Sequence, residues 1–247
     1  MNFIRSVKLD TFTAELGYTA ELPVVKSLAK TEELIFAGPV TYFVGENGTG
    51  KSTLLEAIAV KYGFNAEGGS LNFSFSTKET HSPLHKAIKL IRGIERPKTG
   101  FFLRAESFYN AATYVDNLGY EILQAYGGKS LHEQSHGESF FSLAMNRFSA
   151  NGVYILDEPE AALSPSRQMS LLVRINELVR QGSQFIIATH SPIILAYPDS
   201  VIYELTEKGI TKTVYEDTET YGVMKAFMDS PKRMINHLFD EDEKEQI

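Results

Sequence analysis

The sequence predicts an α/β fold: a core of mostly parallel sheet with an N-terminal antiparallel β portion and a small helical lobe. Two observations carry this prediction. Residues 153–156 and 185–188 are continuous apolar runs, which are typical of strands buried on both faces of a parallel sheet. After residue 40, predicted strands alternate with predicted helices, and that order of elements produces parallel sheets.

The N-terminal part is predicted to be an antiparallel β portion. Residues 2–9 alternate between apolar and polar side chains, as a half-buried strand does. The next thirty or so residues contain turn-forming residues, which favour short antiparallel strands over helices; they are Gly17, Pro23, Gly38 and Pro39. Residues 40–44 then form a buried strand, and residues 52–60 form a helix.

The middle of the chain is predicted to contain strands, a short helix and the helical lobe. Residues 71–75 place three apolar side chains on one face of a strand, and residues 101–106 read as a buried strand that ends in charged residues. Residues 84–92 are predicted to form a short helix between a proline and a glycine. The small helical lobe is expected over about residues 107–150.

The last third has the clearest helix of the sequence, over residues 166–181. Its predicted apolar stripe consists of Met169, Leu172, Val173, Ile175, Leu178 and Val179. Residues 201–216 are predicted to form a hairpin, and two short helices are expected near residues 218–229 and 231–239.

The composition indicates one globular domain over residues 1–247, with an acidic C-terminal tail at residues 240–247. The net charge of −7 argues against a wholly basic nucleic-acid-binding surface, although it permits a local basic patch. The absence of cysteine excludes disulfides and thiolate metal sites, which is compatible with the cytoplasm. No apolar run approaches the roughly 18 residues that a membrane span needs, so we expect no membrane span and a cytoplasmic location.

Residues 45–52 match G-x-x-x-x-G-K-[ST], the pattern of a phosphate-binding P-loop, between a predicted strand and a predicted helix. The glycines permit backbone angles that let successive N–H groups curl round an anion. Lys51 supplies a charge for the β- and γ-phosphates and is a candidate catalytic residue, and the Ser52 hydroxyl is a hard ligand for Mg²⁺. We therefore expect a nucleoside triphosphate to contact Gly45, Glu46, Asn47, Gly48, Thr49, Gly50, Lys51, Ser52 and Thr53.

Two further strand ends carry chemically active side chains. Asp157 and Glu158 directly follow the apolar run at residues 153–156. An acid at a strand tip is how P-loop enzymes hold Mg²⁺, so Asp157 would act on the metal through water. Glu158 would be the general base that polarises the attacking water. His190 follows the next central strand, beside the same sheet edge, where it can donate to the γ-phosphate.

The P-loop, residues 157–159 and His190, in this order and spacing, resemble the ATPase domain of the ABC superfamily. The resemblance covers about residues 40–205. It implies a P-loop fold that hydrolyses ATP to ADP and phosphate with Mg²⁺. It also implies a head-to-tail dimer that encloses two ATP molecules, so that hydrolysis requires dimerisation.

The resemblance also assigns roles to residues between the P-loop and Asp157. The family's signature motif begins a helix, and Ser135, Gly137 and Glu138 stand at the corresponding place. By that resemblance they would contact ATP bound to a second subunit, as a helix N-terminus with a hydroxyl can. Glu106 stands at the place of the family's Q-loop glutamine, which implies a contact to Mg²⁺ and water.

Departures from the transporter pattern point to a subgroup of the family. The signature reads Ser-His-Gly-Glu over residues 135–138, and the arginine- and glutamine-rich helix that follows it in transporter subunits is absent. Residues 157–160 read Asp-Glu-Pro-Glu, and Leu-Ser-Pro follows at residues 163–165. This is similar to the stand-alone AAA/ABC-type ATPases and their OLD, RecF and SMC relatives, and implies a role in DNA maintenance or defence. The partner would be DNA or a separate effector protein.

Two alternatives remain open. The ATPase could be the ATP-binding subunit of a membrane transporter, against which the missing transporter-type helix counts. Residues 132–136 also match H-E-x-x-H, the zinc-peptidase helix, although nearby glycines leave little room for such a helix. A basic stretch at Lys86, Lys89, Arg92, Arg96 and Lys98 could contact nucleic acid or could be a solvated face.

Overall fold

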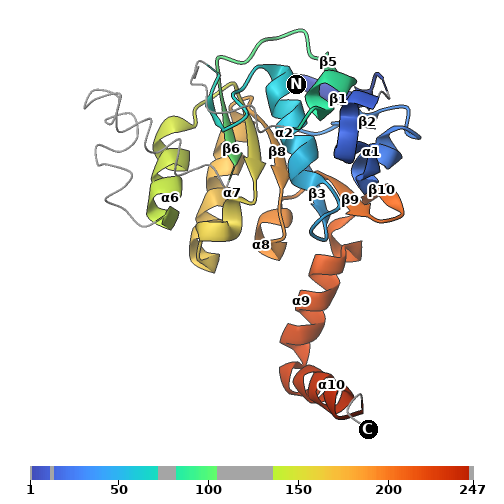
Figure 1. The fold of residues 1–247 in the computed structure, drawn as a ribbon. Helices are drawn as coiled ribbons and strands as arrows, with labels where there is room; N and C mark the ends of the chain where they lie inside the picture. The colour runs from blue at the N-terminus through green and yellow to red at the C-terminus, as the bar shows by residue number, and fades with distance from the viewer. Residues whose placement is uncertain (1, 12–13, 72–81, 105–135, 245–247) are drawn as a thin grey trace.

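The structure is a computed structural model and describes residues 2–11, 14–71, 82–104 and 136–244. Its centre is a mostly parallel sheet with the strand order β10-β9-β3-β8-β7-β6-β4 (Figure 1). The five inner strands run parallel to one another, and the edge strands β10 and β4 pair antiparallel with β9 and β6. The strands are β3 (Val40–Gly45), β4 (Gly69–Ser70), β6 (Thr99–Arg104), β7 (Gly152–Asp157), β8 (Gln184–Ala188), β9 (Val201–Thr206) and β10 (Gly209–Thr213).

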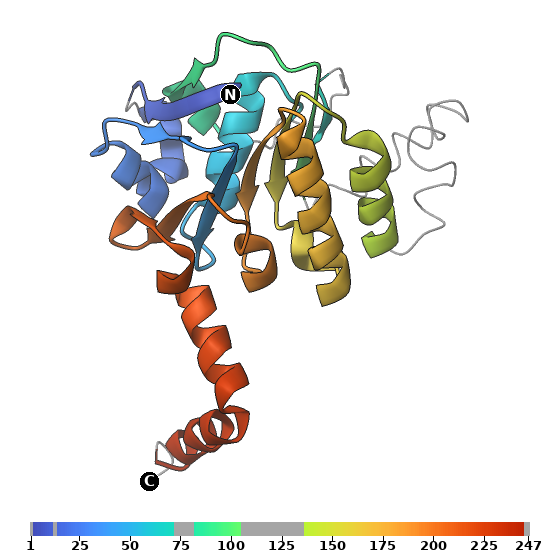
Figure 2. The same ribbon diagram turned by 180° about the vertical axis from the view of Figure 1, so that it is seen from behind.

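The predicted parallel core is confirmed, and helices cover both of its faces (Figures 1 and 2). The helix α2 (Lys51–Tyr62) lies on one face, and α6 (His136–Arg147), α7 (Pro165–Arg180) and α8 (Pro192–Leu195) lie on the other. Alternate strand residues therefore enter different cores: Phe43 packs on the α2 side and Tyr42 on the α7 side. Burial on both faces explains why the strand sequences are continuously apolar.

The antiparallel β portion forms a second sheet with the order β2-β1-β5, built from β1 (Ile4–Leu9), β2 (Leu34–Ile35) and β5 (Ile88–Arg92). Its third strand comes from a segment predicted to be a helix. Only α3 (Leu84–Ala87) is helical there, and β5 pairs with β1 directly after it. The prediction was wrong because the apolar and basic residues from Ile88 to Arg92 fit a strand once β1 offers an antiparallel partner.

The segment between β1 and β2 is also helical where strands were predicted. It contains η1 (Ala14–Glu21) and α1 (Pro23–Leu28). Pro23 was interpreted as a break in a β region, but it stands at the first turn of α1, where a proline is favoured. Val24, Val25 and Leu28 are buried by α1, so this helix joins the core on the α2 side.

The apolar stripe predicted for α7 is confirmed at Ile175 and Leu178 and differs from the buried stripe nearer the start of the helix. Leu171, Ile175 and Leu178 are buried, whereas Met169 and Val173 are 53% and 60% exposed. Three apolar residues occur in a row from Leu171 onward, so periodicity alone allowed more than one face of the helix to be the buried one. Packing against the sheet selects the face at i, i+4 and i+7.

The C-terminal region follows the predicted hairpin and two helices. After η5 (Tyr215–Asp217), α9 (Glu219–Asp229) and α10 (Pro231–Lys244) form an arm that projects from the body (Figures 1 and 2). The first part of the predicted acidic tail belongs to α10, because the helix extends to Lys244. Among the described residues, no helix is long and apolar enough to cross a membrane.

Some predicted features lie partly outside the described residues. Of the predicted strand at 71–75, residues 72–75 are not described, and the neighbouring strand β4 covers Gly69–Ser70. Of the predicted helical lobe at about 107–150, the described part contains α6. Phe140, Leu143 and Ala144 of this helix, and Phe148 after its end, are all buried.

The orientation of α7 gives a stability prediction. We expect Leu171→Ala to lower the free energy of unfolding by about 2–5 kcal/mol, because it removes a buried side chain from the core. Met169→Ala, two residues earlier on the same helix, is the matched control and should change it by no more than about 0.5 kcal/mol. Urea denaturation measures both values, and equal losses would contradict the described packing of α7.

Candidate functional site

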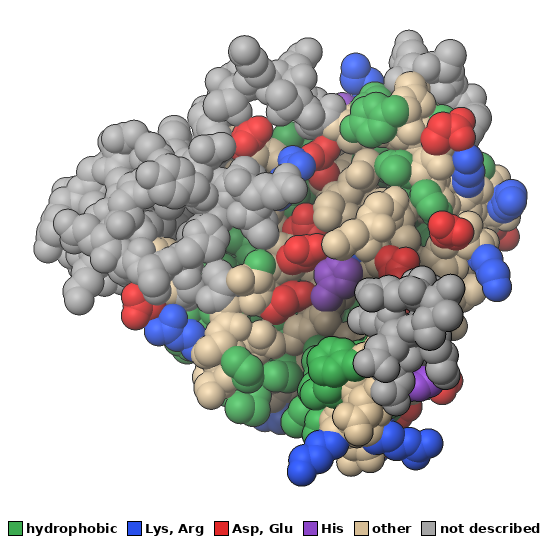
Figure 3. All heavy atoms as spheres, turned by 60° about the horizontal axis from the view of Figure 1, so that its bottom comes forward, with side chains coloured by type: hydrophobic (Ala, Val, Ile, Leu, Met, Phe, Trp, Pro, Cys, Tyr) green, Lys and Arg blue, Asp and Glu red, His purple; other side chains and the backbone are tan. Residues whose placement is uncertain are grey.

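The C-terminal ends of the parallel strands gather the predicted site residues at one edge of the sheet. Phe43 of β3 pairs with Ala188 of β8, and Ala188 pairs with Asp157 of β7. The P-loop, Glu158 and His190 follow these strands directly, so they emerge side by side. On this face, acidic side chains gather round a histidine (Figure 3). Ligands of open α/β sheets bind at such an edge.

The P-loop glycines are required by close packing and backbone angles. Gly45 has a φ of 133°, and a Cβ there would collide with the carbonyl oxygen of Leu205 on β9. Gly50, which precedes the first turn of α2, has a φ of 98°, and a Cβ there would collide with Val24. The loop is thereby held against the start of α2, where backbone N–H groups and the helix dipole favour an anion. This geometry suits the phosphates of a nucleotide.

Lys51 is buried within the P-loop. Its Nζ donates to the carbonyl oxygens of Gly45 at 2.6 Å and Glu46 at 2.8 Å. Burial lowers the pKa of Lys51, and the nearby carboxylates of Glu158 and Asp157 act in the opposite direction. A desolvated ammonium group at the end of a long side chain is suited to bind phosphate oxygens at this place.

Ser52 and Asp157 form a pair of hard oxygen donors. The Ser52 hydroxyl, in the first turn of α2, donates to Oδ1 of Asp157 at 3.0 Å. Asp157 is 6% exposed and ends β7, so both groups are held by regular elements. A carboxylate and a hydroxyl beside a phosphate site fit Mg²⁺, which prefers oxygen ligands and completes its octahedron with water and substrate phosphates. Glu106, the third predicted metal contact, lies outside the described residues.

Glu158 and His190 face each other across the edge. Nε2 of His190 lies 3.5 Å from Oε1 of Glu158, and both side chains are more than a third exposed. The Nε2 atom itself is buried and makes no hydrogen bond to the described residues, which leaves its hydrogen-bonding capacity unused. Glu158 has a left-handed backbone with a φ of 48°, and its N–H donates to the carbonyl of Ala188 at 3.0 Å. Such strain in a non-glycine residue is typical of functional sites.

Glu160 is a structural neighbour of His190 that the sequence interpretation did not single out. Its Oε1 accepts the backbone N–H of His190 at 2.5 Å. Its Oε2 is buried and makes no hydrogen bond to the part of the chain that the structure describes. Glu160 belongs to η4 (Pro159–Ala162), which follows Glu158 directly. The chain therefore uses one segment both to present Glu158 and to position His190.

Gln168 strengthens the same link. Its Oε1 accepts the hydroxyl of Ser191 at 2.6 Å, and its Nε2 donates to the carbonyl of Leu163 at 2.9 Å. Gln168 lies on α7, so one side chain joins the segments that follow Glu158 and His190. No sequence signal marked it, because a glutamine on the polar side of a helix resembles any solvated residue.

A buried ion pair also supports the edge. Nη1 of Arg104, at the end of β6, lies 2.6 Å from Oε2 of Glu56, and Arg104 pairs with Asp157 in the sheet register. Glu56 is 5% exposed, and its Oε1 also accepts the N–H of Ser82 at 2.8 Å. The pair connects α2, one turn after Ser52, to the strand beside Asp157. Sequence pattern placed Glu56 on a helix without showing this role.

The structure describes two of the three predicted signature residues. Ser135 is outside the described residues, and Gly137 is in the first turn of α6, which packs against α7 and η4. Glu138 is about half exposed and forms an exposed ion pair with Arg167 at 3.4 Å. Of residues 132–136, the predicted zinc-peptidase pattern, only His136 reaches the described part of the chain.

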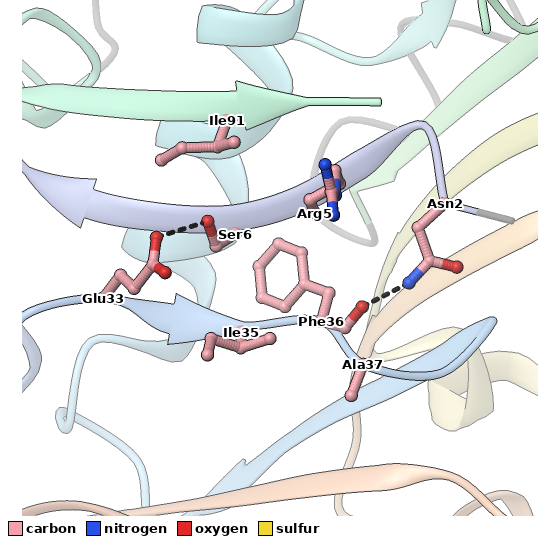
Figure 4. A pocket seen from close by; sticks show the side chains of 8 residues that line it. All are labelled: Asn2, Arg5, Ser6, Glu33, Ile35, Phe36, Ala37 and Ile91. Atoms are coloured by element: carbon pink, nitrogen blue, oxygen red, sulfur yellow. Dashed lines mark hydrogen bonds between the residues drawn. The ribbon is translucent and has the colours of Figure 1, made fainter. Parts of the chain in front are cut away.

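Two hollows in the surface are candidate ligand sites. One, of about 560 Å³, lies beside the P-loop and is lined by residues 45–49, the β9–β10 turn and Glu219. The other, of about 490 Å³, lies on the N-terminal sheet, where Ser6 donates to Glu33 and Asn2 donates to the Phe36 carbonyl (Figure 4). The first hollow is lined by Gly45 and Glu46, whose carbonyl oxygens accept from Nζ of Lys51. We therefore place the function there.

Two family models match parts of the chain. The family model described as "ABC transporter" matches residues 31–161, more than half of the chain. The model described as "AAA ATPase domain" matches residues 137–195.

Curated relatives have names that refer to transport. The L-arabinose transport ATP-binding protein AraG of Geobacillus stearothermophilus is 26% identical over 226 residues, covering 83% of this chain and 41% of that protein. The ribose import ATP-binding protein RbsA of Yersinia pestis is 24% identical over 211 residues, covering 75% of this chain and 39% of that protein. The chain thus spans about two fifths of the length of these relatives.

Solved structures with related folds include two kinds of protein. The SMC head domain from Thermotoga maritima has a TM-score of 0.44 and 16% identity, covering 86% of this chain and 99% of that chain. The cbiO1 protein from Clostridium perfringens, part of an ABC transporter complex, has a TM-score of 0.49 and 20% identity, covering 97% and 100%.

The contact between Glu160 and His190 gives a local prediction. In Glu160→Ala the backbone N–H of His190 loses its acceptor, so we expect this amide to exchange with solvent at least about tenfold faster. Glu160→Gln retains a side-chain oxygen and should change the rate much less. Hydrogen exchange followed by NMR measures the rate at His190, with the exposed Glu207→Ala as the control. An unchanged rate in Glu160→Ala would contradict the positioning role.

Proposed function

This chain belongs to the ABC superfamily of ATPases, and we propose that it binds MgATP and hydrolyses it to ADP and phosphate as a head-to-tail dimer. The observation that carries the proposal is the meeting of Lys51, Ser52, Asp157 and Glu158 at one sheet edge. Residues 1–247 would form one ATPase domain that includes a helical lobe. The absence of cysteine is compatible with a reducing cytoplasm, where we place this activity.

The P-loop would bind the triphosphate. The curled backbone over residues 45–50 and the first residues of α2, Lys51 to Thr53, would surround the β- and γ-phosphates. Nζ of Lys51 would exchange its two loop carbonyls for phosphate oxygens, which gives the ammonium group stronger, charged partners. Ser52 and Asp157 would hold Mg²⁺, with Glu106 as a further contact. When bound, Mg²⁺ neutralises charge that develops on the phosphates.

Glu158 and His190 would carry the proton chemistry. The Glu158 carboxylate would accept a proton from the attacking water as the water oxygen bonds to the γ-phosphorus. The bond between the γ-phosphorus and the bridging oxygen would break, which releases ADP and phosphate. Nε2 of His190, which makes no hydrogen bond to the described residues, would donate a hydrogen bond to a γ-phosphate oxygen. The hydrogen bonds of Glu160 and Gln168 would hold Glu158 and His190 in fixed positions relative to each other.

The second half of each site would come from a second copy. Ser135, Gly137 and Glu138, at the start of α6, would approach the γ-phosphate held by the other chain's P-loop. The N-terminus of a helix of 12 residues is suited to that charge. Neither copy would hydrolyse ATP at full rate alone, because each P-loop would lack these contacts.

For the process, we favour DNA maintenance or defence. In support, all five basic residues of the strip formed by Lys86, Lys89, Arg92, Arg96 and Lys98 are exposed, on α3, β5 and the following loop. Arg92 lies over the ring of Tyr62 at 4.8 Å, and the other four extend this positive strip. The second candidate is the ATP-binding subunit of a transporter, which the names of the curated relatives favour.

ATP turnover with linear duplex DNA tests the process. We expect DNA to stimulate steady-state turnover and the stimulation to fall steeply with salt, because counterion release drives such binding. Lys86→Glu combined with Lys89→Glu should abolish the stimulation and leave the DNA-free rate unchanged. Lys212→Glu, an exposed lysine on β10, is the matched control. Lys51→Ala should abolish both turnover and calorimetric ATP binding.

The outcomes separate the candidates. An ATP turnover rate that duplex DNA does not change would contradict the DNA role and would favour a separate effector protein or a transporter partner. Unchanged ATP affinity in Lys51→Ala would contradict the assignment of the P-loop itself.

Glu158→Gln tests the reaction and the dimer together. We expect turnover to fall at least about 10²-fold, because the proton acceptor is lost while the shape of the side chain is retained. ATP should still bind, so that ATP-bound dimers accumulate and are detected by light scattering. His190→Ala should slow turnover more than it weakens binding. A monomeric Glu158→Gln protein at saturating ATP would count against the head-to-tail dimer.

A further inference from the structure

The arm formed by α9 and α10 exposes an unusual amount of apolar surface. Seven of the 14 large apolar residues that are exposed in the described part of the chain lie on it. They are Val223, Met224, Phe227, Met228, Ile235, Leu238 and Phe239. No residue of α9 is buried. An apolar patch this concentrated is typical of an interaction surface.

The apolar residues form a stripe on each helix. On α9, Val223 and Phe227 are four residues apart, as are Met224 and Met228, so the four lie on one side of the helix. On α10, Ile235 and Phe239 repeat the same spacing. Each helix therefore has the amphipathic pattern of a packed helix, although the arm projects away from the body (Figures 1 and 2). The part of the chain that the structure describes leaves most of both stripes exposed.

The arm begins at the nucleotide-binding face. The backbone N–H of Glu219 donates to Oε1 of Glu204 at 3.1 Å, which attaches the first turn of α9 to the end of β9. A hollow of about 280 Å³ is lined by Glu46 of the P-loop, by His190 and by Val223 and Met224 of the arm. From this point the arm extends away from the sheet edge (Figure 1).

We propose that the arm packs against a second copy of this chain and clamps the ATP-bound dimer; this rests on the proposed head-to-tail arrangement. In that arrangement the P-loop of one copy faces the start of α6 of the other. An arm rooted beside the P-loop then reaches the partner's α6 and α7. Those helices expose Met145, Met169 and Val173, which supply apolar surface to receive it.

Charge also favours a second copy. The receiving α7 carries Arg167, Arg174 and Arg180, whereas the last part of α10 has the acidic sequence Asp240-Glu241-Asp242-Glu243. Opposite charges at the rim would steer the arm onto its partner. In the sequence, the apolar residues of α10 are followed by Asp240-Glu241-Asp242-Glu243, which an anionic membrane would repel.

The test measures dimerisation of full-length protein in the Glu158→Gln background with saturating MgATP. Met228→Glu and Phe239→Glu place a charge on side chains that are 70% and 65% exposed, so the fold of each monomer should be retained. We expect the dimer dissociation constant from sedimentation velocity to rise at least about tenfold in each variant. Val173→Glu, on the receiving α7, should weaken the dimer likewise.

The matched control is Ile94→Glu. Ile94 is 95% exposed and lies between β5 and β6, at the opposite end of the sheet from the nucleotide face. Its dimer constant should equal that of the parent. Circular dichroism and ATP affinity per chain should be unchanged in all variants, which separates a loss of the clamp from a loss of fold or of nucleotide.

Each result decides the proposal. If the arm variants dimerise as the parent does, the clamp is wrong while the ATP-bound dimer stands. If the parent itself stays monomeric, the clamp and the dimer both fail. Flotation with phosphatidylcholine–phosphatidylserine vesicles adds a third outcome. Binding that Met228→Glu abolishes, with an unchanged dimer constant, would assign the arm to a membrane surface and overturn the proposal.

Discussion

Parallel hydrogen bonding among β3, β8 and β7 determines where the P-loop, Glu158 and His190 lie. Because Phe43 pairs with Ala188 and Ala188 with Asp157, three segments that are far apart in the sequence leave the sheet at the same level. A shift of one residue in either pairing would turn the buried side chains of a strand to the opposite face. The two apolar cores, one under α2 and one under α7, therefore hold the register and, through it, the site.

Side-chain hydrogen bonds and an ion pair then fix the positions of the segments that the strand register brings together. Glu160 and Gln168 connect the segment after Glu158 to the segment after His190, and the Glu56–Arg104 pair connects α2 to the strand beside Asp157. Buried charges are costly unless they are paired, so these contacts resist displacement. They also offset the strain at Glu158, whose left-handed backbone costs about 1–2 kcal/mol. The arrangement gives rigid support to two side chains that remain partly exposed to a ligand.

The sheet and the arm differ in how much of their apolar surface is buried. The sheet is covered on both faces, whereas the arm exposes seven large apolar side chains in the described part of the chain. The proposed site is divided in a similar way, since the P-loop and the start of α6 would act on different ATP molecules. Both features are explained if the working unit contains two copies. Dimer formation would then complete the site and cover the arm at the same time. The state of the nucleotide would thereby be coupled to the position of the arm.

The sequence by itself determined the elements whose signals are local. Continuous apolar runs identified the central strands, and the spacing of glycines, Lys51 and Ser52 identified the P-loop, because each pattern reflects one strand or one turn. Only the tertiary structure decided the features that depend on a distant partner. Residues 88–92 became a strand because β1 was there to pair with them, and the buried face of α7 was selected by the sheet. Glu160 and Gln168 were recognised only when folding brought them to residues 190 and 191, since no spacing along the chain encodes a hydrogen bond across it.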